Sequence, residues 1–418
     1  MSLLLKNVSV GFSDSSLKNK STNVLIKNGI IAEIGSGFTG DKELDLTGCY
    51  LAPGFMDLWS HFCEPGFEHK EDIHSGLSVA MAGGYTDVCL LPNTEPIIDS
   101  KSQLNFIQKA SSSSPIQLHV YASVSQKGKD EVIAEFKDLH EHGAIGFTGG
   151  LHPISNSELL LKALQYSQSF GGLVLNRPND NNLSRYGQMH ESVISTQLGM
   201  KGIPVVAEKI AVERDLSILA YAGGRLHLSG ISSRIAIEKI RKAKSEGLAV
   251  TCDVPIHNLV FTDQDLMAFD SNLKMDPPLR EKSDQEALVQ GLLDGTIDAI
   301  SSFHIPQDTE SKELEFDLSE FGSISLQTVL SQSLTLTDNI PLEILLNKLS
   351  NGPRKVLGLP AIKLEKGEIA RYTIIDPRKS WVFDSSSNRS KSSNSVLLGR
   401  HLVGKAMGVV IGDQWHEC

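Results

Sequence analysis

The sequence contains few cysteines and no closely spaced pair of them. Its 418 residues include five, at scattered positions: Cys49, Cys63, Cys89, Cys252 and Cys418. Because disulfide frameworks and zinc knuckles need paired cysteines, this pattern argues against both and predicts free thiols in a reducing compartment. We therefore expect a cytoplasmic protein whose cysteines are mostly small buried side chains.

Long apolar runs and an excess of positive charge are also missing. No run of about 18 apolar residues is present, so the sequence predicts no membrane span. The first residues, MSLLLKNVSVGF, lack a basic segment followed by a long apolar one, which favours a first β-strand over a signal peptide. A net charge of -11 and a pI near 5.6 disfavour nucleic acid and anionic membranes as partners, because both attract basic surfaces.

Common catalytic motifs are absent as well. The sequence has no Walker A loop, dinucleotide fingerprint, GxSxG elbow or kinase signature. The isolated stretches GFTGG and AGGY are typical of tight turns. The sequence therefore offers no competing catalytic motif of these kinds.

The two ends of the chain share one pattern. Residues 1–50 contain short β-rich runs separated by Gly, Ser, Asn and Asp, and residues 359–418 repeat this pattern. We expect the two parts to form one β-sandwich domain. The polar stretch DSSSNRSKSSNS, residues 384–395, predicts a mobile loop within it.

Between these parts, residues 51–358 alternate strand-like apolar runs with helical patterns. Repeated β–α units indicate a parallel sheet covered by helices, and about eight of them favour a closed (β/α)₈ barrel. In such barrels the chemistry lies at the carboxyl ends of the strands. The last residues of each run are therefore the candidate site residues.

The stretch MDLWSHFCEPG, residues 56–66, begins the predicted barrel. Asp57, Trp59 and His61 alternate along it, and a period of two predicts that all three side chains face the barrel interior. Such a strand end is typical of a metal site. A tryptophan, however, has a ring N–H donor and no lone pair for a metal.

These features resemble the class I dihydroorotases of the cyclic amidohydrolase superfamily. The matching stretches follow in family order: LAPGFMDL, EPGFEHKEDI, AGGYTDVCLLPNTEPIID, TCDVPIHNLVFTDQDL, NLKMDPPLR, DGTIDAI and DLSEFGSISLQT. The resemblance spans essentially the whole chain. It implies the barrel-plus-sandwich fold, a zinc site at the strand ends and hydrolysis of a cyclic amide C–N bond.

The resemblance also implies which positions carry the metal site. Trp59 stands where the family has its first zinc-binding histidine, whereas His61 matches the second. The other ligand positions and the catalytic aspartate are occupied here by Gly149, Asn176, Gly230 and Phe303. His227 lies three residues before Gly230, and we expect it to face away from that point. The comparison predicts no bound metal, because only His61 remains as a ligand-type residue.

The substrate positions differ too. Cys63 stands where the family has the arginine that grips the substrate carboxylate, Asp276 replaces an asparagine, and Gln307 replaces a loop histidine. Asn93 and His304 are retained. Losing a guanidinium and adding a carboxylate predicts weak binding of dihydroorotate and carbamoyl aspartate, since both are anions.

Structural roles account for several of these residues. We expect Trp59 and Phe303 to fill the barrel mouth. We expect His61 to be held by a hydrogen bond and His304 to stabilise a loop. Asp57 and Glu64 are interpreted as scaffold hydrogen-bonding groups.

A catalytic zinc normally has three protein ligands, which these positions do not offer. The sequence therefore predicts a non-catalytic dihydroorotase-like protein of pyrimidine biosynthesis. Similar degenerate family members associate with aspartate transcarbamoylase, so the resemblance implies that partner, in a hetero-complex or together with homo-oligomerisation. Two alternatives stay open. One is an active dihydroorotase or other cyclic amidohydrolase with an atypical zinc site, and the other is a small-molecule sensor built around Asn93 and Asp276.

Overall fold

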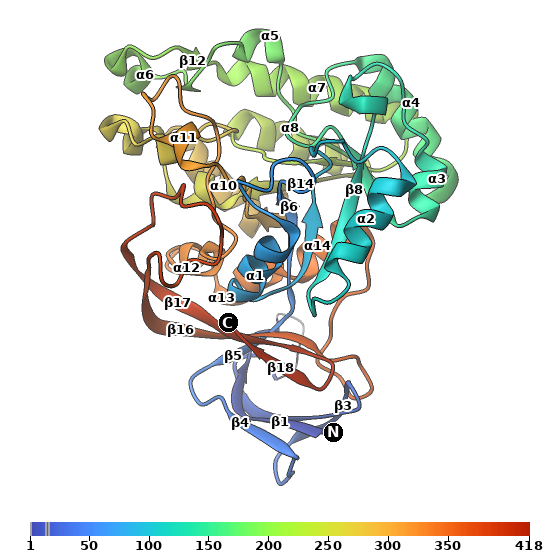
Figure 1. Cartoon of the computed structure of the whole chain (residues 1–418), viewed down its shortest axis with the longest axis vertical. Coiled ribbons are helices and arrows are strands. Elements are labelled where there is room, and N and C mark those ends of the chain that lie inside the picture. Colours follow the sequence, from blue (N-terminus) through green and yellow to red (C-terminus); the bar gives the residue numbers. More distant parts are fainter. Residues whose placement is uncertain (1, 13–14, 16) are drawn as a thin grey trace.

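The structure is a computed structural model that describes residues 2–12, 15 and 17–418. Residues 1, 13, 14 and 16 of the predicted first sandwich segment lie outside the described residues. Figure 1 shows a sheet formed by both ends of the chain, at the bottom, and a helix-covered barrel above it. In the described part of the chain, no helix has the length and apolar character that crossing a membrane requires.

Both ends of the chain contribute strands to one sheet. The order is β18-β17-β16-β5-β1-β2-β3, with β4 also paired to β1. The strands are β1 (Ser2–Val10), β2 (Ser21–Lys27), β3 (Ile30–Gly35), β4 (Lys42–Asp45), β5 (Tyr50–Pro53), β16 (Arg371–Phe383), β17 (Arg400–Ile411) and β18 (Gln414–Glu417). β5 and β16 join the two ends, with Ala52 opposite Thr373. The predicted composite β-sandwich is thus confirmed.

The apolar pattern of these strands explains their packing. Leu3 and Leu5 of β1 and Val24 and Ile26 of β2 recur with a period of two, so each pair lies on one face of its strand, and all four are buried in one core cluster. Tyr372 joins this cluster from β16. The sandwich therefore has its own apolar core, built from residues far apart in the sequence.

Eight parallel strands form the barrel, in the order β15-β14-β13-β10-β9-β8-β7-β6. They are β6 (Phe55–Ser60), β7 (Tyr85–Leu90), β8 (Gln117–Ser123), β9 (Ala144–Thr148), β10 (Val174–Asn176), β13 (Leu226–Leu228), β14 (Val250–Pro255) and β15 (Ala299–Ser301). A parallel bridge between Ser60 and His304 links the first and last strands beyond β15. The predicted (β/α)₈ barrel is confirmed.

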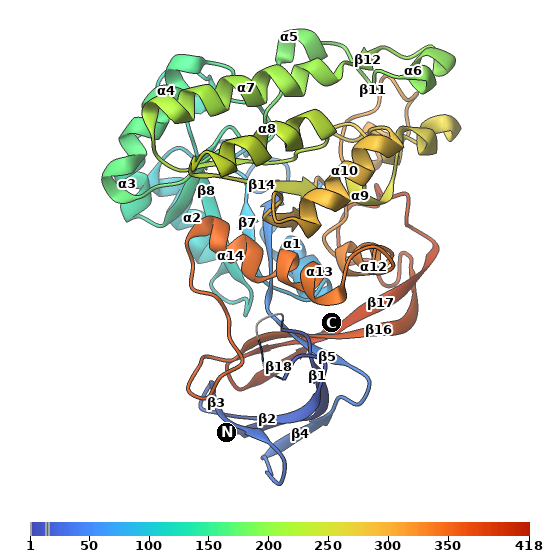
Figure 2. The same cartoon turned by 180° about the vertical axis from the view of Figure 1, so that it is seen from behind.

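Helices surround this barrel (Figure 2). The longer ones are α1 (Ile73–Ala82), α2 (Lys101–Ser111), α3 (Phe136–Glu141), α4 (Ser157–Ser167), α7 (Val205–Ala222), α8 (Arg234–Ser245), α10 (Lys282–Leu293), α12 (Val329–Leu334), α13 (Leu342–Leu349) and α14 (Asn351–Leu357). Shorter elements are α5 (Asn181–Ser184), α6 (Val193–Leu198), α9 (Ile256–Val260), α11 (Thr309–Lys312), the two-stranded pair β11 (Met189–His190) and β12 (Gly202–Ile203), and the 3₁₀ turns η1 (Gln126–Gly128), η2 (Gln168–Phe170), η3 (Asp263–Ala268) and η4 (Ser271–Leu273).

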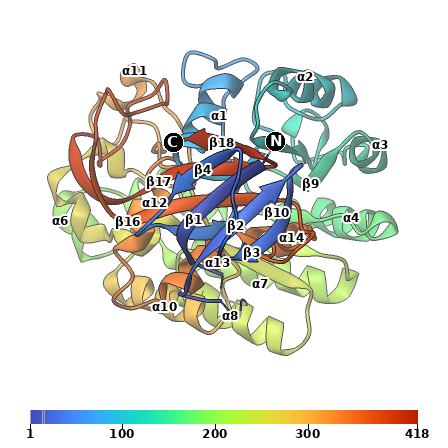
Figure 3. The ribbon, with the colours of Figure 1, turned by 90° about the horizontal axis from the view of Figure 1, so that it is seen from below.

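Local sequence explains where these helices begin and which face they bury. Asp72 caps α1, because its carboxylate accepts a hydrogen bond from the backbone N–H of Ser75. In α8, Ile237 and Ile240 face the barrel while charged residues face solvent. Figure 3 shows that the sandwich sheet lies across one end of the barrel, which leaves the carboxyl ends of the strands at the opposite end.

Candidate site at the barrel mouth

The first barrel strand departs from regular alternation near its end. Its pairing with β7 shifts register between Asp57 and Ser60, and the adjacent residues Leu58 and Trp59 both pack into the interior cluster. The expected placement of Asp57, Trp59 and His61 on one face therefore does not hold, because a strand irregularity intervenes.

Asp57 fastens the first strand to the last one. Its carboxylate accepts hydrogen bonds from Ser60 Oγ at 2.5 Å, from the Ser302 backbone N–H at 2.6 Å and from Ser302 Oγ at 2.8 Å. Complete burial raises the pKa of this carboxyl, while these hydrogen bonds lower it. This side chain has the contacts that a scaffold role requires.

Trp59 and Phe303 stack on each other at the barrel mouth. Their ring centroids are 5.1 Å apart and their planes differ by 15°. Both side chains are buried. Gly230 makes room for the stack, because a Cβ at this position would lie 2.6 Å from Phe303 Cζ. The absence of a side chain at position 230 and the phenyl ring at position 303 are thus complementary in shape.

His61 is buried, and both of its ring nitrogens have neighbours. Nε2 lies 2.8 Å from the carbonyl oxygen of Asn93, and Nδ1 lies 3.3 Å from Cys63 Sγ. Since a carbonyl only accepts, Nε2 carries the proton and Nδ1 faces the thiol. Burial lowers the pKa of His61 to about 4 and raises the pKa of Cys63, so the pair is neutral at pH 7.

Asn176 is engaged outside the barrel centre. Its Nδ2 donates to Asp215 of α7 at 2.6 Å, and its Oδ1 accepts from the backbone N–H of Ile154 at 2.8 Å. Burial raises the pKa of Asp215 to about 6 despite the neighbouring Arg214. The amide of Asn176 therefore connects β10 to α7 and to the loop after β9.

Gly149 and Asn93 belong to one loop arrangement. A Cβ at Gly149 would lie 2.4 Å from the carbonyl oxygen of His152. Asn93 Nδ2 donates to the carbonyl oxygen of Gly149 at 3.0 Å, and Asn93 Oδ1 accepts from the Leu151 backbone N–H at 2.8 Å. The loop is thus too tight for a side chain at position 149, and Asn93 braces it.

His227 lies in a buried polar network next to Gly230. Its Nδ1 is 2.9 Å from Thr251 Oγ1 and its Nε2 is 3.3 Å from Asp253 Oδ2. The same carboxylate accepts from the Gly230 backbone N–H at 2.6 Å and from Ser301 Oγ at 2.7 Å. Both ring nitrogens of His227 are therefore occupied by other side chains.

Among the described residues, the family ligand positions 59, 149, 176, 230 and 303 supply no second metal-ligating side chain beside His61. The neighbouring Cys63 thiol stays protonated, because burial raises its pKa. One group of three ligand-type side chains lies elsewhere, formed by His190, Glu281 and Asp284. Arg280 Nη1 lies 3.0 Å from His190 Nδ1, and burial together with this guanidinium lowers the pKa of His190 to about 4. A positive charge at this distance disfavours a cation there.

A cavity of about 480 Å³ remains above the aromatic stack. Its lining includes Trp59, His152, Arg177, Arg185, Tyr186, Asp276 and Gln307. Arg177 Nη1 lies 2.6 Å from Asp276 Oδ1, and Nη2 donates to the carbonyl oxygen of Leu151 at 3.0 Å. The carboxylate of Asp276 is therefore compensated, contrary to the negative charge that we inferred from this residue. Arg177 is not among the site residues predicted from the sequence, although it directly follows Asn176 at a strand end.

His304 and Gln307 stabilise the loop that follows β15. His304 Nδ1 accepts from the backbone N–H of Ser325 at 3.2 Å, and Nε2 lies 3.6 Å from a carboxylate oxygen of Glu71. Gln307 Nε2 donates to the carbonyl oxygen of Phe321 at 2.8 Å, and Gln307 Oε1 accepts from Lys70 Nζ at 2.6 Å. These contacts give both residues a structural role.

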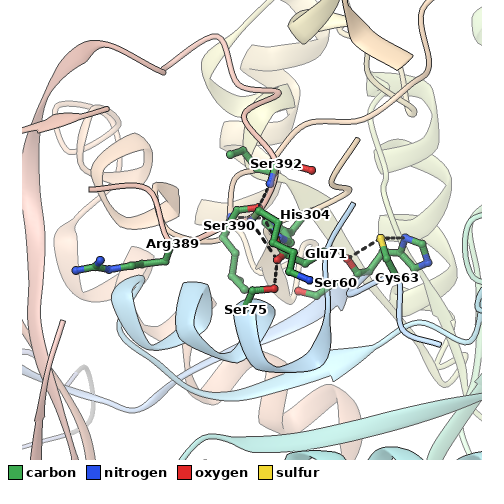
Figure 4. A network of polar contacts seen from close by, with 12 residues as sticks. Ser60, Cys63, Glu71, Ser75, His304, Arg389, Ser390 and Ser392 are labelled. Atoms are coloured by element: carbon green, nitrogen blue, oxygen red, sulfur yellow. Dashed lines mark hydrogen bonds and ion pairs between the residues drawn. The ribbon is translucent and has the colours of Figure 1, made fainter. Parts of the chain in front are cut away.

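Residues 384–395, which we call the strap, are held by hydrogen bonds to the barrel loops. Figure 4 shows Ser390 and Ser75 around Glu71, whose carboxylate accepts from both hydroxyl groups. Ser392 Oγ donates to the carbonyl oxygen of Lys70 at 2.7 Å, and Asn394 Nδ2 donates to that of Ile305 at 3.1 Å. The prediction of a mobile loop was therefore wrong, because its polar residues have partners on the barrel.

Comparison with solved structures defines the class of this fold. The L-hydantoinase (dihydropyrimidinase) from Arthrobacter aurescens aligns with a TM-score of 0.88 at 22% sequence identity, covering 99% of this chain and 95% of that one. A D-hydantoinase structure aligns with a TM-score of 0.85 at 20% identity and the same coverage. The fold is that of the hydantoinase-type amidohydrolases.

Sequence comparison identifies the family. A family model described as Dihydro-orotase-like matches residues 48–236. The dihydroorotase of Trichlorobacter lovleyi is 38% identical over 420 residues, covering 99% of each chain. That of Geobacter metallireducens is 37% identical over 398 residues, covering 94% of each, and that of Syntrophus aciditrophicus is 39% identical over 396 residues, covering 93% of each. The chain belongs to the dihydroorotase-like family.

Proposed function

We propose that this chain is a dihydroorotase-like protein of pyrimidine biosynthesis that holds no catalytic zinc and does not hydrolyse dihydroorotate. We further propose that it acts as a structural or regulatory partner of aspartate transcarbamoylase. The observation that carries the first part is the Trp59–Phe303 stack against Gly230, which places two aromatic rings where the family has a metal ligand and the catalytic aspartate.

The donor set at the mouth supports this proposal. Catalytic zinc sites use three protein ligands, and the ion lowers the pKa of its water from about 15.7 to about 7. At the family ligand positions of the described chain, the one imidazole is His61, and its two ring nitrogens face Asn93 and Cys63. Asn176 is hydrogen-bonded to Asp215, and positions 149 and 230 have no side chain. The site as built does not fit a zinc ion.

The position of the family's catalytic aspartate also lacks an acid–base side chain, because Phe303 occupies it. Phe303 has no proton to exchange, and loss of a positioned acid or base alone reduces rates by roughly 10² to 10⁴. Loss of the metal-bound hydroxide as well reduces the rate further. The Arg177 guanidinium is also paired with Asp276, so it is not free to bind an anionic substrate at this position.

The test compares this protein with the Trichlorobacter lovleyi relative, purified and assayed identically. We expect substoichiometric zinc by elemental analysis. We expect turnover of dihydroorotate and carbamoyl aspartate at least about 10⁴-fold lower than in the relative. Stoichiometric zinc with turnover near that of the relative would overturn the non-catalytic proposal.

The partner proposal has a separate test. The protein is mixed with the aspartate transcarbamoylase encoded in the same genome, and the mass of the eluting species is measured by light scattering during gel filtration. We expect one complex with a changed carbamoylation rate. Separate elution of the two proteins at micromolar concentration would remove this partner.

The second candidate function is an active cyclic amidohydrolase with an atypical zinc site. Relatives named Dihydroorotase, at 36–39% identity over 93–99% of the chain, favour it. The variant His61→Ala separates the two functions. An active enzyme would lose turnover with this change, whereas a non-catalytic partner would lose only folding stability.

A further inference from the structure

Exposed apolar side chains gather on one part of the surface. Met267 and Phe269 lie in and just after η3, and Leu314 and Leu318 follow α11. Their side chains are 51%, 43%, 48% and 63% exposed, respectively. The two segments are neighbours, because Phe269 contacts the ring of Phe316 at 6.2 Å between centroids. We call residues 263–270 and 308–320 the acidic face. Figure 1 shows α11 beside the strap, on the side of the barrel away from α2 and α3.

The charge of the acidic face has one sign. Its acidic residues are Asp263, Asp265, Asp270, Asp308, Glu310, Glu313, Glu315, Asp317 and Glu320. Six of them are exposed: Asp265, Glu310, Glu313, Glu315, Asp317 and Glu320. In these two segments, all of whose residues the structure describes, Lys312 is the one lysine or arginine, and it is buried. No exposed cation within the segments offsets the six carboxylates.

Two buried lysines hold the backbone of this face in place. Lys274 Nζ donates to the carbonyl oxygens of Phe316, Asp317 and Ser319 at 2.8, 3.1 and 2.6 Å. Lys312 Nζ donates to the carbonyl oxygen of Glu320 at 2.7 Å. The backbone of the segment that exposes Leu314 and Leu318 is therefore held by hydrogen bonds from these two lysines. A preorganised surface loses less conformational entropy when it binds.

Exposed apolar groups held rigidly in this way are typical of interaction sites. We infer that the acidic face binds a protein partner whose surface carries lysine and arginine around large apolar side chains. The apolar groups supply buried area, and the carboxylates supply electrostatic complementarity and fast association. The inference rests on the proposed function only in that the protein works through a protein partner.

The negative charge of the acidic face favours a basic protein partner over a second copy of this chain, nucleic acid or an anionic membrane. A second copy of the same face would bring carboxylates against carboxylates, which opposes symmetric self-association through it. Nucleic acid and anionic membranes are repelled for the same reason. A basic protein surface satisfies both the charge and the exposed leucines.

The experiment uses two variants of the face and one matched control. The charge variant is Glu313→Lys with Glu315→Lys and Asp317→Lys. The apolar variant is Leu314→Ser with Leu318→Ser. The control combines two charge reversals with one apolar-to-serine change at exposed residues in and before α3, Glu131→Lys with Val132→Ser and Glu141→Lys. All replaced side chains are exposed, so thermal unfolding should show that every variant folds like the parent.

The first probe is the aspartate transcarbamoylase of the same genome, with affinity measured by biolayer interferometry at two salt concentrations. We expect each face variant to weaken binding at least about 10-fold and the control to stay within about two-fold. Salt should weaken parental binding more than that of the charge variant. Face variants that bind like the parent, or a control that weakens equally, would overturn the inference while leaving the partner in place.

If the parent protein does not bind transcarbamoylase, a second probe tests whether the acidic face is a binding site. That result removes the proposed partner, and the face is then tested with a synthetic amphipathic peptide of leucine and lysine and with its glutamate counterpart. Binding of the lysine peptide to parent and control, with loss in both face variants, supports the acidic face. Absence of parental binding, or equal binding to the charge variant, rejects it.

Discussion

The two ends of the barrel are closed by different interactions, a buried cluster of charged side chains at the base and an aromatic stack at the mouth. At the end that faces the sandwich, the carboxylate of Asp87 on β7 lies 2.7 Å from Arg371 of β16, 3.3 Å from Arg354 of α14 and 3.0 Å from His119. Burial alone would raise the pKa of Asp87, but His119 and the two arginines hold it well below its usual range. At the mouth, the corresponding space holds the Trp59–Phe303 stack and the neutral His61.

The difference shows what the fold itself requires. The charged cluster at the base joins the barrel to the sandwich, so its residues have a structural reason to remain. The mouth of a barrel carries the chemistry in this architecture, and its polar groups are not needed to close the sheet. Polar residues that do persist there, such as Asn93 and Asn176, connect loops and helices. Under our proposal, the fold survives without the reaction because the two ends are supported independently.

The largest expected loss of stability follows from a substitution in the charged cluster at the base of the barrel. Asp87→Ala should lower the free energy of unfolding by about 4 kcal/mol, because it leaves two arginines and a histidine without their buried counter-charge. Urea unfolding measures this value. The control Asp138→Ala removes an exposed partner of His142 and should change stability by less than about 1 kcal/mol. Equal effects of the two changes would remove the structural role of the base cluster.

The aromatic stack should matter for stability and not for turnover. Trp59→Ala empties a fully buried site and should cost about 3 kcal/mol. Dihydroorotate turnover should stay at the background of the parent. Tyr221→Ala, on an exposed face of α7, serves as the control and should change stability by less than about 0.5 kcal/mol. A Trp59→Ala protein as stable as the parent would mean that the mouth is not filled by this stack.

Substitution of Gly230 tests whether the Phe303 ring of the aromatic stack needs the space left by the missing side chain at position 230. Gly230→Ala should cost about 2 kcal/mol, part of it from positive φ and part from collision with Phe303. Gly247→Ala is the matched control, since Gly247 also has positive φ but no atom within 4 Å of its added Cβ. It should cost only the backbone part, about 1 kcal/mol.

A double-mutant cycle with Phe303→Ala completes this test. Removing the phenyl ring should recover the collision part, a coupling of about 1 kcal/mol measured by urea unfolding. Additive effects of the two substitutions would show that the glycine and the ring are independent.

The smallest expected effect concerns pH. His61 has a pKa of about 4 in the folded protein against 6.5 for the free side chain, so the unfolded chain binds more protons between these values. Stability should therefore fall as pH decreases from 6.5 towards 4. His61→Gln should reduce the loss between pH 7 and 5.5 by about 1 kcal/mol. The exposed His74→Gln is the control, and an identical pH slope in parent and His61→Gln would contradict the buried neutral imidazole.

Sequence patterns predicted the elements better than the contacts between them. The period-two spacing of Leu3 and Leu5 and the repeated β–α units are local patterns, so the strands of the sandwich and the barrel could be predicted from short stretches of sequence. The irregularity between Asp57 and Ser60 could not, because it depends on pairing with another strand. The same holds for the pairing of Arg177 with Asp276, 99 residues apart in the sequence.

The strap is ordered although residues 384–395 have the polar composition of a mobile loop. A run of serines and asparagines predicts disorder when its groups have only water as a partner. Here Ser390 reaches Glu71, 319 residues away, and Asn394 reaches Ile305. Order in this segment depends on barrel loops that a sequence window does not contain.

The composite sheet imposes an order on biosynthesis. The backbone N–H of Phe55 donates to Thr373 Oγ1, 318 residues later, and one of the two strands that pair with β5 is β16 of the same later segment. At roughly 5–20 residues per second of translation, the first strands leave the ribosome tens of seconds before that partner exists. During this interval the edge of β5 that pairs with β16 has no partner strand, and the contacts between the sandwich and the base of the barrel form only after residue 373 has emerged.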